Sequence, residues 1–462
     1  MKTLLVNPPQ RDLARGIYKE RYIIREECAA GIYNLKYLPA QIFLAANYLR
    51  ERGKDVDAID AETSRVSLNG YDVVVVWAAV LGNFYRDIDF LRSVKEKGKK
   101  TVLILNDPYE GFEMEAMQRF GFIDAAVRLW EREVVLDKLL SKWGKEEQPE
   151  FKGVIYRKNG KIMDTGTVAP LSNLEHLRSC SKLLEELPLE KYESAIIIPG
   201  RGCPQHHSFC LFHRSGPRRR RVQDVISEFE TISTGIKRVL IVHPAMITDR
   251  KWTKKFTDEL VLRRLKVSWR ADARIGDCSL LRLSSLRKAG CDTIMMGVES
   301  LDTEVAKMVK AGMNPKMLKK AILNLQRTLI APMPVFYLGF LWDSNKTLLK
   351  IKKFLREVPI PHFQLRYARP WKGTPYYEDC KRLGVLKRDL ELDDYVNSGL
   401  ASPLVDTLYL TKDEITWWCH SIMRSAMFNP RFVLRALLEK REIKLRNINY
   451  FRLLKDLLGK HA

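Results

Sequence analysis

The sequence predicts an α/β protein: an N-terminal doubly wound parallel (Rossmann-like) sheet, then a partial (β/α)6 barrel, then a helical C-terminal region. Short β-branched runs alternate with helical patterns twice along the chain, which is typical of parallel sheets covered by helices. A chain of 462 residues is long enough for two or three domains. We therefore divide it into residues 1–145 (α/β domain), 146–192 (hairpin and linker), 193–400 (barrel) and 401–462 (helical region).

The first domain has its predicted ligand edge where its strands end. Ligands of parallel sheets bind beyond the carboxyl ends of the strands, so Asn7 and Pro8, which follow the first strand, are candidate cofactor-binding residues. No G-x-G-x-x-G sequence follows that strand, so the dinucleotide fingerprint is absent. The expected strands are Lys2–Asn7, Val56–Asp60, Val73–Trp77 and Val102–Leu105, with a helix at Ala40–Arg52.

A hairpin separates the two α/β parts. The Asn159-Gly160 pair between two β-branched runs predicts a tight turn joining Phe151–Tyr156 to Ile162–Val168. From Ala195 onward six strand–helix repeats favour a parallel barrel over an open sheet. The expected strands are Ala195–Ile198, Arg238–His243, Lys266–Arg270, Thr293–Met296, Val335–Phe340 and Phe363–Tyr367. The expected helices are Val222–Ser233, Thr253–Arg264, Leu280–Ala289, Thr303–Lys310, Pro315–Thr328 and Lys346–Glu357.

Charge and hydropathy narrow the function classes. Lys and Arg number 79 against 56 Asp and Glu, giving a formal net charge of +23. Such an excess is compatible with nucleic acid or an anionic membrane surface as partner, but no recognisable nucleic-acid module is present. The longest uncharged stretch, residues 328–342, is too short for a spanning helix. The amino terminus lacks the shape of a signal peptide, so we expect a cytoplasmic protein.

Eight cysteines are too sparse for a disulfide scaffold, and six of them read as small buried hydrophobic residues. Cys203 and Cys210 share one segment, Gly202-Cys203-Pro204-Gln205-His206-His207-Ser208-Phe209-Cys210, which follows the first barrel strand. Soft ligands on a loop at the functional face of a barrel indicate a metal site. The alternative is a loop with two incidental thiols and surface histidines.

This segment resembles the cluster loop of radical S-adenosylmethionine (SAM) enzymes, which carries three cysteines separated by three and then two residues. Cys203 and Cys210 match the outer positions, whereas His207 occupies the middle one. In the family three thiolates hold a 4Fe–4S cluster whose fourth iron binds SAM. The resemblance therefore implies metal ligation by Cys203, His207 and Cys210. Imidazole on iron raises the cluster potential, and a Cys-His-Cys zinc site is the alternative.

Further segments extend the resemblance. Gly297-Val298-Glu299-Ser300 resembles the SAM-contact motif after the family's fourth strand, which implies that Gly297, Glu299 and Ser300 contact SAM. Arg274 resembles the family's arginine on its third strand; otherwise it is a solvated residue. The family's acidic pair after the second strand is replaced by His243-Pro244, and His243 is open to interpretation as a ligand, a base or a packed residue.

The first domain resembles that of the cobalamin-binding subclass, which includes methyltransferases and the anaerobic porphyrin cyclase. Leu4–Pro9, Tyr37-Leu38-Pro39 and Ala426–Arg431 carry this resemblance, which implies cobalamin as a further cofactor. The subclass often has a Gly-Glu-rich turn where this chain has residues 128–133, including Trp130 and two arginines that would narrow the nucleotide-tail pocket. A repurposed α/β domain is the alternative.

Two basic stretches have two interpretations each. Arg214 and the run 218–221 are either a solvated loop or a clamp for an anionic group. Residues 431–462 carry nine Lys and Arg, with an apolar stripe from Tyr450 to Leu458. That segment is either a helix packed on the barrel or an interfacial helix on anionic lipid, which would make the protein peripheral to the membrane.

The resemblance implies a cobalamin-dependent radical SAM enzyme, most simply a methyltransferase acting on an unactivated carbon of a small, anionic or lipid-like molecule. Its electron donor would be a ferredoxin or flavodoxin. The alternatives are non-radical methyl transfer with an atypical Cys-His-Cys cluster, and a non-catalytic metal- or anion-binding protein on the same fold. The sequence does not identify catalytic side chains beyond these ligands.

Overall fold

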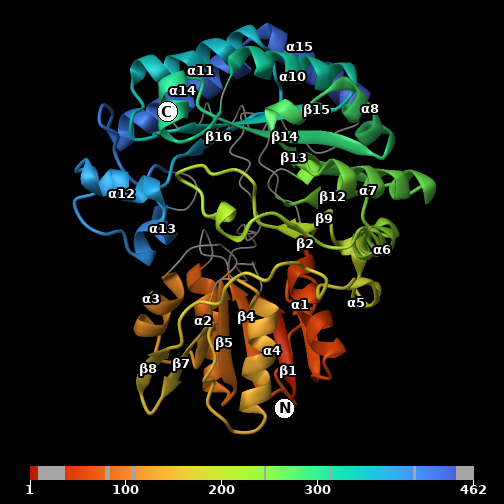
Figure 1. Cartoon of the computed structure of the whole chain (residues 1–462), viewed down its shortest axis with the longest axis vertical. Helices are drawn as coiled ribbons and strands as arrows, with labels where there is room; N and C mark the ends of the chain where they lie inside the picture. Colours follow the sequence, from red (N-terminus) through yellow and green to blue (C-terminus); the bar gives the residue numbers. More distant parts are fainter. Residues whose placement is uncertain are drawn as a thin grey trace.

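The computed structural model describes residues 1–8, 37–78, 84–105, 111–128, 130–243, 246–312, 314–398 and 402–443. Two sheets lie one above the other along the long axis, the amino-terminal sheet, which is mainly parallel, below and the parallel barrel sheet above (Figure 1). The segment leading into the barrel, which includes α5 (Ser181–Glu185), lies beside the junction of the two. The predicted α/β architecture is thus confirmed.

In the described part of the chain the amino-terminal sheet has the strand order β3-β1-β4-β5-β6-β7-β8, and its first five strands are parallel. Every residue of β4 is buried, as expected for a strand covered on both faces. The strands are β1 (Thr3–Asn7), β3 (Val56–Asp60), β4 (Val73–Ala78), β5 (Lys100–Leu105), β6 (Ala125–Val127), β7 (Val154–Lys158) and β8 (Lys161–Asp164).

Helices cover both faces of this sheet because alternate strand residues point to opposite sides. Val73 and Val75 share one core with α1 (Ala40–Glu51) and α4 (Arg132–Trp143). Val74 and Val76 share the other with α2 (Phe84–Glu96) and α3 (Phe112–Arg119). This alternation produces the doubly wound arrangement that the sequence predicts.

The predicted hairpin belongs to the amino-terminal sheet. Its strands β7 and β8 turn at Asn159 and Gly160, both with positive φ (50° and 76°). Because β7 pairs antiparallel with β6, the hairpin extends the sheet by two strands rather than standing alone.

The barrel sheet is parallel throughout, in the order β16-β15-β14-β13-β12-β9-β2. Six of its strands match the predicted ones within a few residues, and they alternate with the predicted helices. They are β9 (Ser194–Ile197), β12 (Arg238–Ile241), β13 (Ser268–Ala273), β14 (Cys291–Glu299), β15 (Ala331–Leu338) and β16 (Gln364–Tyr367). Their helices are α6 (Val222–Ser233), α7 (Arg250–Leu262), α8 (Leu280–Lys288), α9 (Thr303–Met308), α10 (Pro315–Arg327) and α11 (Asn345–Glu357).

The seventh strand of the barrel sheet comes from the amino-terminal part of the chain. The short strand β2 (Tyr37–Pro39), which leads directly into α1, pairs in parallel with β9. The sequence places these residues only at the entry to α1. One chain segment therefore serves both layers, which fixes the barrel on the amino-terminal domain.

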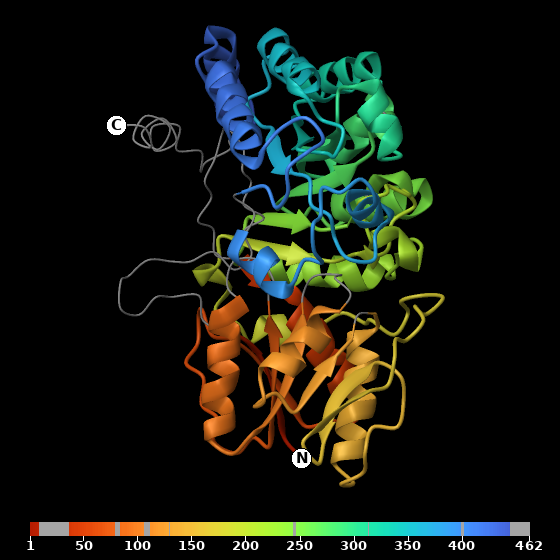
Figure 2. The ribbon, with the colours of Figure 1, turned by 90° about the vertical axis from the view of Figure 1, so that its left-hand side faces the viewer.

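The carboxyl-terminal region is helical, as predicted, and packs on the barrel (Figure 2). Thr411 and Glu414 form the expected capping box at the start of α14. No helix within the described residues is long and apolar enough to cross a membrane. The apolar stripe at residues 450–458 lies outside the described residues. The described helices of the predicted region are α14 (Lys412–Met427) and α15 (Pro430–Ile443); α12 (Pro375–Arg382) and α13 (Leu392–Ser398) precede it.

Candidate functional site: the cysteine loop at the mouth of the barrel

The loop that carries Cys203 is closed by a two-residue ladder. Strand β10 (Gly200–Arg201) pairs antiparallel with β11 (Arg218–Arg219). A Cβ atom on Gly200 would lie 2.3 Å from the Arg218 carbonyl oxygen, and one on Gly202 only 1.5 Å from that of Gly216. Gly202 also has a φ of 80°, so glycine is needed for the two ends of the loop to approach each other.

The middle of the loop is anchored to the barrel. The Ser208 amide donates to the carbonyl of Val309 (3.1 Å), and the amide of Tyr376 donates to the carbonyl of Ser208 (3.0 Å). The Phe209 ring packs against those of Tyr337 and Phe340, with centroids 5.2 Å apart in both cases. These contacts tie the loop to the end of α9, to α12 and to the carboxyl end of β15.

The predicted ligands Cys203, His207 and Cys210 all lie in this anchored loop. Both cysteines are free thiols, and the Gln205 amide donates to Cys203 Sγ at 3.4 Å. Burial raises the pKa of Cys203, and it raises the pKa of Cys210 to about 11. Such thiols become thiolates at neutral pH only when a cation binds them, so they suit a metal centre better than free nucleophilic chemistry.

The spacing of these ligand atoms bears on the kind of metal centre. In the described part of the chain, one group of three side chains has its ligand atoms within 4.8 Å of one another: Glu131, Glu133 and His176. The ligand atoms of Cys203, His207 and Cys210 are farther apart than that. Sulfur ligands of one tetrahedral zinc ion lie about 3.8 Å apart, because Zn–S bonds are about 2.3 Å. The loop is therefore more open than a preformed zinc site.

Glu299 brings a buried carboxylate to the same place. It ends β14 with a φ of 62°, and its Oε1 lies 3.7 Å from His207 Nδ1. A Cβ on Gly297 would be 2.4 Å from that oxygen, so Gly297 leaves room for it. Burial raises the pKa of Glu299 to about 8, and Oε2 has no hydrogen-bond partner in the described part of the chain. An orphaned buried acceptor is suited to a ligand that brings a donor or a positive charge.

Two other expected SAM contacts are engaged locally. Ser300 is buried, and its Oγ accepts the Asp302 amide at 3.1 Å, just before α9. Arg274 donates through Nε to Asp277 Oδ2 at 3.0 Å, while its positive charge favours the thiolate of Cys203. The structure thus places Arg274 close enough to act electrostatically on the cysteine loop, with Asp277 orienting its guanidinium.

His243 is buried, as its interpretation as a packed residue requires, whereas two arginines of the run match neither of their alternatives. His243 is fully buried, and its ring contacts the guanidinium of Arg219 at 2.6 and 2.7 Å. Arg218 donates to Glu131, and Arg220 forms a completely buried pair with Glu228. Both guanidinium groups are therefore paired with carboxylates of the protein itself. The prediction of a clamp for an external anion is wrong for these two arginines, and so is the prediction of a solvated loop. The Arg214 side chain lies outside the described residues.

The amino-terminal sheet presents polar residues at the edge facing the barrel. Asn7 Nδ2 donates to Asp60 Oδ1 at 2.7 Å, and Tyr192 donates its hydroxyl proton to Asp60 Oδ2 at 2.9 Å. Burial raises the pKa of Asp60. Asn7 and the adjacent Pro8 therefore lie at the predicted ligand edge. Residues 79–83 and 106–110, which continue that edge, lie outside the described residues.

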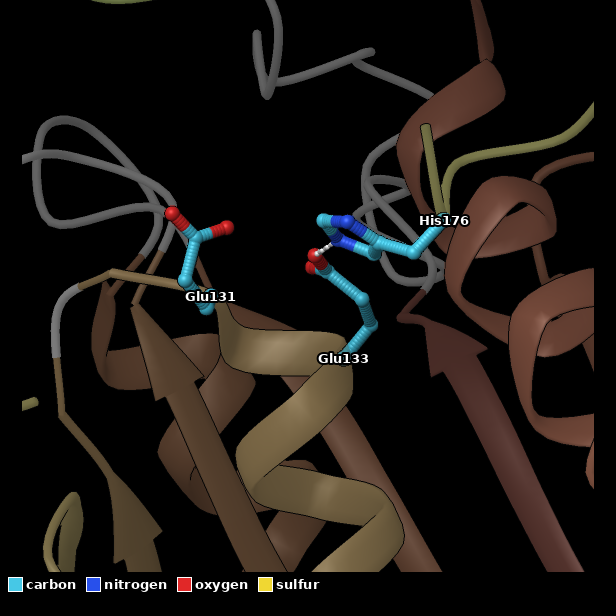
Figure 3. Close-up of side chains that lie close together, drawn as sticks. All are labelled: Glu131, Glu133 and His176. Atoms are coloured by element: carbon cyan, nitrogen blue, oxygen red, sulfur yellow. Dashed lines mark hydrogen bonds and ion pairs between the residues drawn. The ribbon is translucent and has the colours of Figure 1, made fainter. Parts of the chain in front are cut away.

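An ion-pair network that sequence reasoning missed connects this edge to the cysteine loop. Glu131 and Glu133, both 1 % exposed, begin α4 and face His176 of the linker (Figure 3). Arg201 donates to Glu131 (2.9 Å) and, through two nitrogens, to Glu133 (2.9 Å each), while His176 Nε2 lies 2.8 Å from Glu133. Guanidinium groups thus occupy the carboxylates, which makes this a structural network rather than a metal site.

The turn before α4 also differs from expectation. Arg128, expected to narrow a nucleotide-tail pocket, forms an ion pair with Asp164 of β8. Trp130 and Glu131 both have positive φ (76° and 42°), which turns the Glu131 carboxylate inward. The only available sequence signal was the Glu-x-Glu spacing, which is also common on solvated helix ends.

Comparison with known proteins identifies the barrel. Residues 197–355 match the family model of the radical SAM superfamily. This part of the chain is therefore a radical SAM domain. The sequence-based assignment is therefore confirmed for the part of the chain that carries Cys203, His207, Cys210 and Glu299.

One curated relative matches nearly the whole chain, and a second matches 74% of it. The chain is 21% identical over 463 residues to an uncharacterized methyltransferase, PH0819, of Pyrococcus horikoshii, covering 95% of each chain. It is 25% identical over 362 residues to bacteriochlorophyllide d C-12(1)-methyltransferase of Chlorobaculum tepidum, covering 74% of each.

Solved structures share the complete two-domain fold. The radical SAM methyltransferase TsrM of Kitasatospora setae, solved with cobalamin and a [4Fe-4S] cluster, superposes with a TM-score of 0.69 and 14% identity, covering 92% of this chain and 91% of that one. The cobalamin-dependent radical SAM enzyme OxsB gives a TM-score of 0.67 at 14% identity, covering all of this chain and 75% of that one. The predicted fold of the cobalamin-binding subclass is therefore confirmed.

Proposed function

We propose that this chain is a cobalamin-dependent radical SAM methyltransferase. The observation that carries the proposal is the anchored loop of Cys203, His207 and Cys210, with the orphaned carboxylate of Glu299 beside it. Its relatives are named as methyltransferases, and the solved proteins with this fold bind cobalamin, a cluster or both. The substrate would be a small molecule, as in the TsrM structure with tryptophan.

Each group of candidate residues would hold a different cofactor, according to where it lies in the fold. Cys203 and Cys210 would supply thiolates and His207 an imidazole to an iron–sulfur cluster, and Glu299 would accept a hydrogen bond from SAM. Asn7 and Pro8 would border cobalamin at the edge of the amino-terminal sheet. The cluster would supply the electron for SAM cleavage, and cobalamin would carry the methyl group. Phe209 and its aromatic neighbours would exclude water beneath the loop.

His207 favours a second candidate, non-radical methyl transfer. An imidazole in place of a thiolate raises the reduction potential of a cluster, and a less reducing cluster is a poorer electron donor to SAM. The cluster and cobalamin would then be retained while radical cleavage is lost.

Anaerobic reconstitution with iron, sulfide and cobalamin tests both candidates. Iron, sulfide, cobalt and zinc are quantified, low-temperature EPR spectra are recorded with and without SAM, and 5′-deoxyadenosine and S-adenosylhomocysteine are measured. Formation of both products supports the first candidate, and S-adenosylhomocysteine alone supports the second. Zinc without sulfide would overturn both.

Variants of the loop test the role of His207. We expect His207→Ala to lose iron, whereas His206→Ala should retain it, because His206 is an exposed residue of the same loop. His207→Cys should lower the reduction potential of the cluster and raise SAM cleavage. Equal iron content in the two alanine variants would show that His207 is not a ligand.

A further inference from the structure

A groove on the carboxyl-terminal side of the barrel takes no part in the proposed chemistry. It has a volume of about 580 Å³ and runs along the seam of α11 and α14. These two helices pack at the end of the barrel remote from the amino-terminal sheet (Figure 1). Whatever binds there would not compete for the cysteine loop.

The charged side chains that line the groove are mostly cationic: Lys352, Arg356 and Arg424, against one carboxylate. Lys352 and Arg356 are one turn apart on α11, and Arg424 faces them from α14. Lys352 is held in place by donating to Ser421 Oγ at 2.8 Å. Among the described lining residues the opposing carboxylate is that of Asp413. The groove therefore has an excess of positive charge before His420, another lining residue, is counted.

Within the described part of the chain, Arg356 and Arg424 have no carboxylate partner, unlike Arg263 and Arg282 of the barrel. Arg263 pairs with Glu230 and Arg282 with Asp277, at 2.7 and 3.0 Å. For Arg356 and Arg424 no carboxylate lies within 4.0 Å among the residues that the structure describes, and neither guanidinium donates a hydrogen bond there. Two guanidinium groups at one groove are suited to bind phosphate oxygens.

Exposed aromatic side chains lie at the same groove. Trp417 is 60 % exposed and Phe428 58 % exposed. Phe428, the residue that caps α14, follows Trp417 by eleven positions, or about three helical turns and a rise of about 16 Å, so both residues lie on the helix face that bears Arg424. Exposed aromatic rings beside basic residues characterise surfaces that rest at the boundary between headgroups and acyl chains.

We propose that this groove binds the headgroup of an anionic phospholipid, with Trp417 and Phe428 entering the membrane interface. The cationic side chains of the groove complement the negative charge of such a headgroup. The exposed rings of Trp417 and Phe428 favour a lipid bilayer as the ligand over a soluble phosphate ester. The proposal is independent of the chemistry at the cysteine loop, because it rests on α11 and α14 alone.

Vesicle binding of the full chain tests it, using phosphatidylcholine vesicles with and without phosphatidylglycerol at low salt. We expect binding only to the anionic vesicles, with a blue shift in fluorescence that Trp417→Phe removes. Arg356→Gln/Arg424→Gln should weaken binding by about fivefold per residue, hence roughly 25-fold. The charge-matched control Lys316→Gln/Lys320→Gln, on exposed positions of α10, should bind within about twofold of the unchanged protein.

Three outcomes would overturn the proposal. Absence of binding to anionic vesicles would do so directly. Equal weakening by the two double variants would assign binding to the net charge of +23 rather than to the groove. Inhibition of vesicle binding by glycerol phosphate at the concentration of the lipid headgroups would assign the groove to a soluble phosphate ester. Thermal melting of each variant confirms that it is folded.

Discussion

Replacing Glu133 by glutamine removes the charge at the centre of the network that ties α4 to the cysteine loop. Glu133 is 1 % exposed and accepts hydrogen bonds from Arg201 at two distances of 2.9 Å. An amide of the same shape retains one acceptor but turns an NH₂ group toward donors of Arg201 or His176. The variant thus keeps the volume and loses the electrostatic match.

The expected loss of unfolding free energy in Glu133→Gln depends on the ion pairs that Arg201 keeps. Removing one partner of a fully buried ion pair lowers the free energy of unfolding by about 3–5 kcal/mol, and we expect about 3 kcal/mol for Glu133→Gln. The lower end applies because Arg201 keeps its bond to Glu131 and its side chain is 28 % exposed. The matched control is Glu147→Gln, which removes an exposed pair with Lys142 close to the end of the same helix. Because both partners are exposed to solvent, that change should leave the free energy of unfolding nearly unchanged.

The assay is urea unfolding followed by circular dichroism and tryptophan fluorescence, repeated at acid pH. Burial alone would raise the pKa of Glu133, but Arg201 and His176 lower it below its ordinary value of 4.5. A carboxylate with a depressed pKa stabilises the fold above its unfolded pKa and loses that contribution as the pH falls. The difference between the unchanged protein and Glu133→Gln should therefore shrink below about pH 4.5. A loss no larger than that of Glu147→Gln, or one independent of pH, would refute the reasoning.

Three further changes test the packing around the site. Gly202→Ala places a Cβ 1.5 Å from the Gly216 carbonyl oxygen, so the loop should open and reconstituted iron content should fall; undiminished iron would contradict this. Arg220→Met should cost about 3–5 kcal/mol in urea unfolding by isolating Glu228, whereas Arg220→Met/Glu228→Leu should recover most of it; a double variant no better than the single would argue against a desolvated pair. Burial raises the pKa of Asp343 from 3.8 to about 7, so its contribution to stability declines as pH rises through this interval, and Asp343→Asn should flatten that decline in melts at successive pH values.

The elements of the fold could be predicted because their signals are local. Strand β4 is a run of valines buried on both faces, and the hairpin turn is specified by Asn159 and Gly160. The capping box of α14 depends on Thr411 and Glu414, three residues apart. Each signal involves residues close in sequence, so the sequence pattern alone is enough to predict the local structure.

Contacts between the two layers could not be predicted in this way. Strand β2 has only three residues, and its partner β9 begins more than 150 residues later. The carboxylates of Glu131 and Glu133 look like an ordinary solvated helix start until Arg201, about 70 residues away, is placed beside them. In sequence, a buried charge pair between distant segments is indistinguishable from two surface charges.

The ladder that closes the cysteine loop explains why these distant contacts matter for the site. Arg201 and Arg218 are direct partners across β10 and β11, so they form the two ends of the loop that carries Cys203. Both arginines donate to Glu131, which begins α4 of the amino-terminal domain. One buried carboxylate therefore holds both ends of the loop against the edge where Asn7 lies. The position of the loop that carries Cys203, His207 and Cys210 is thus set by the amino-terminal domain as well as by the barrel, and a change at Glu131 should affect the loop and the interface between the layers together.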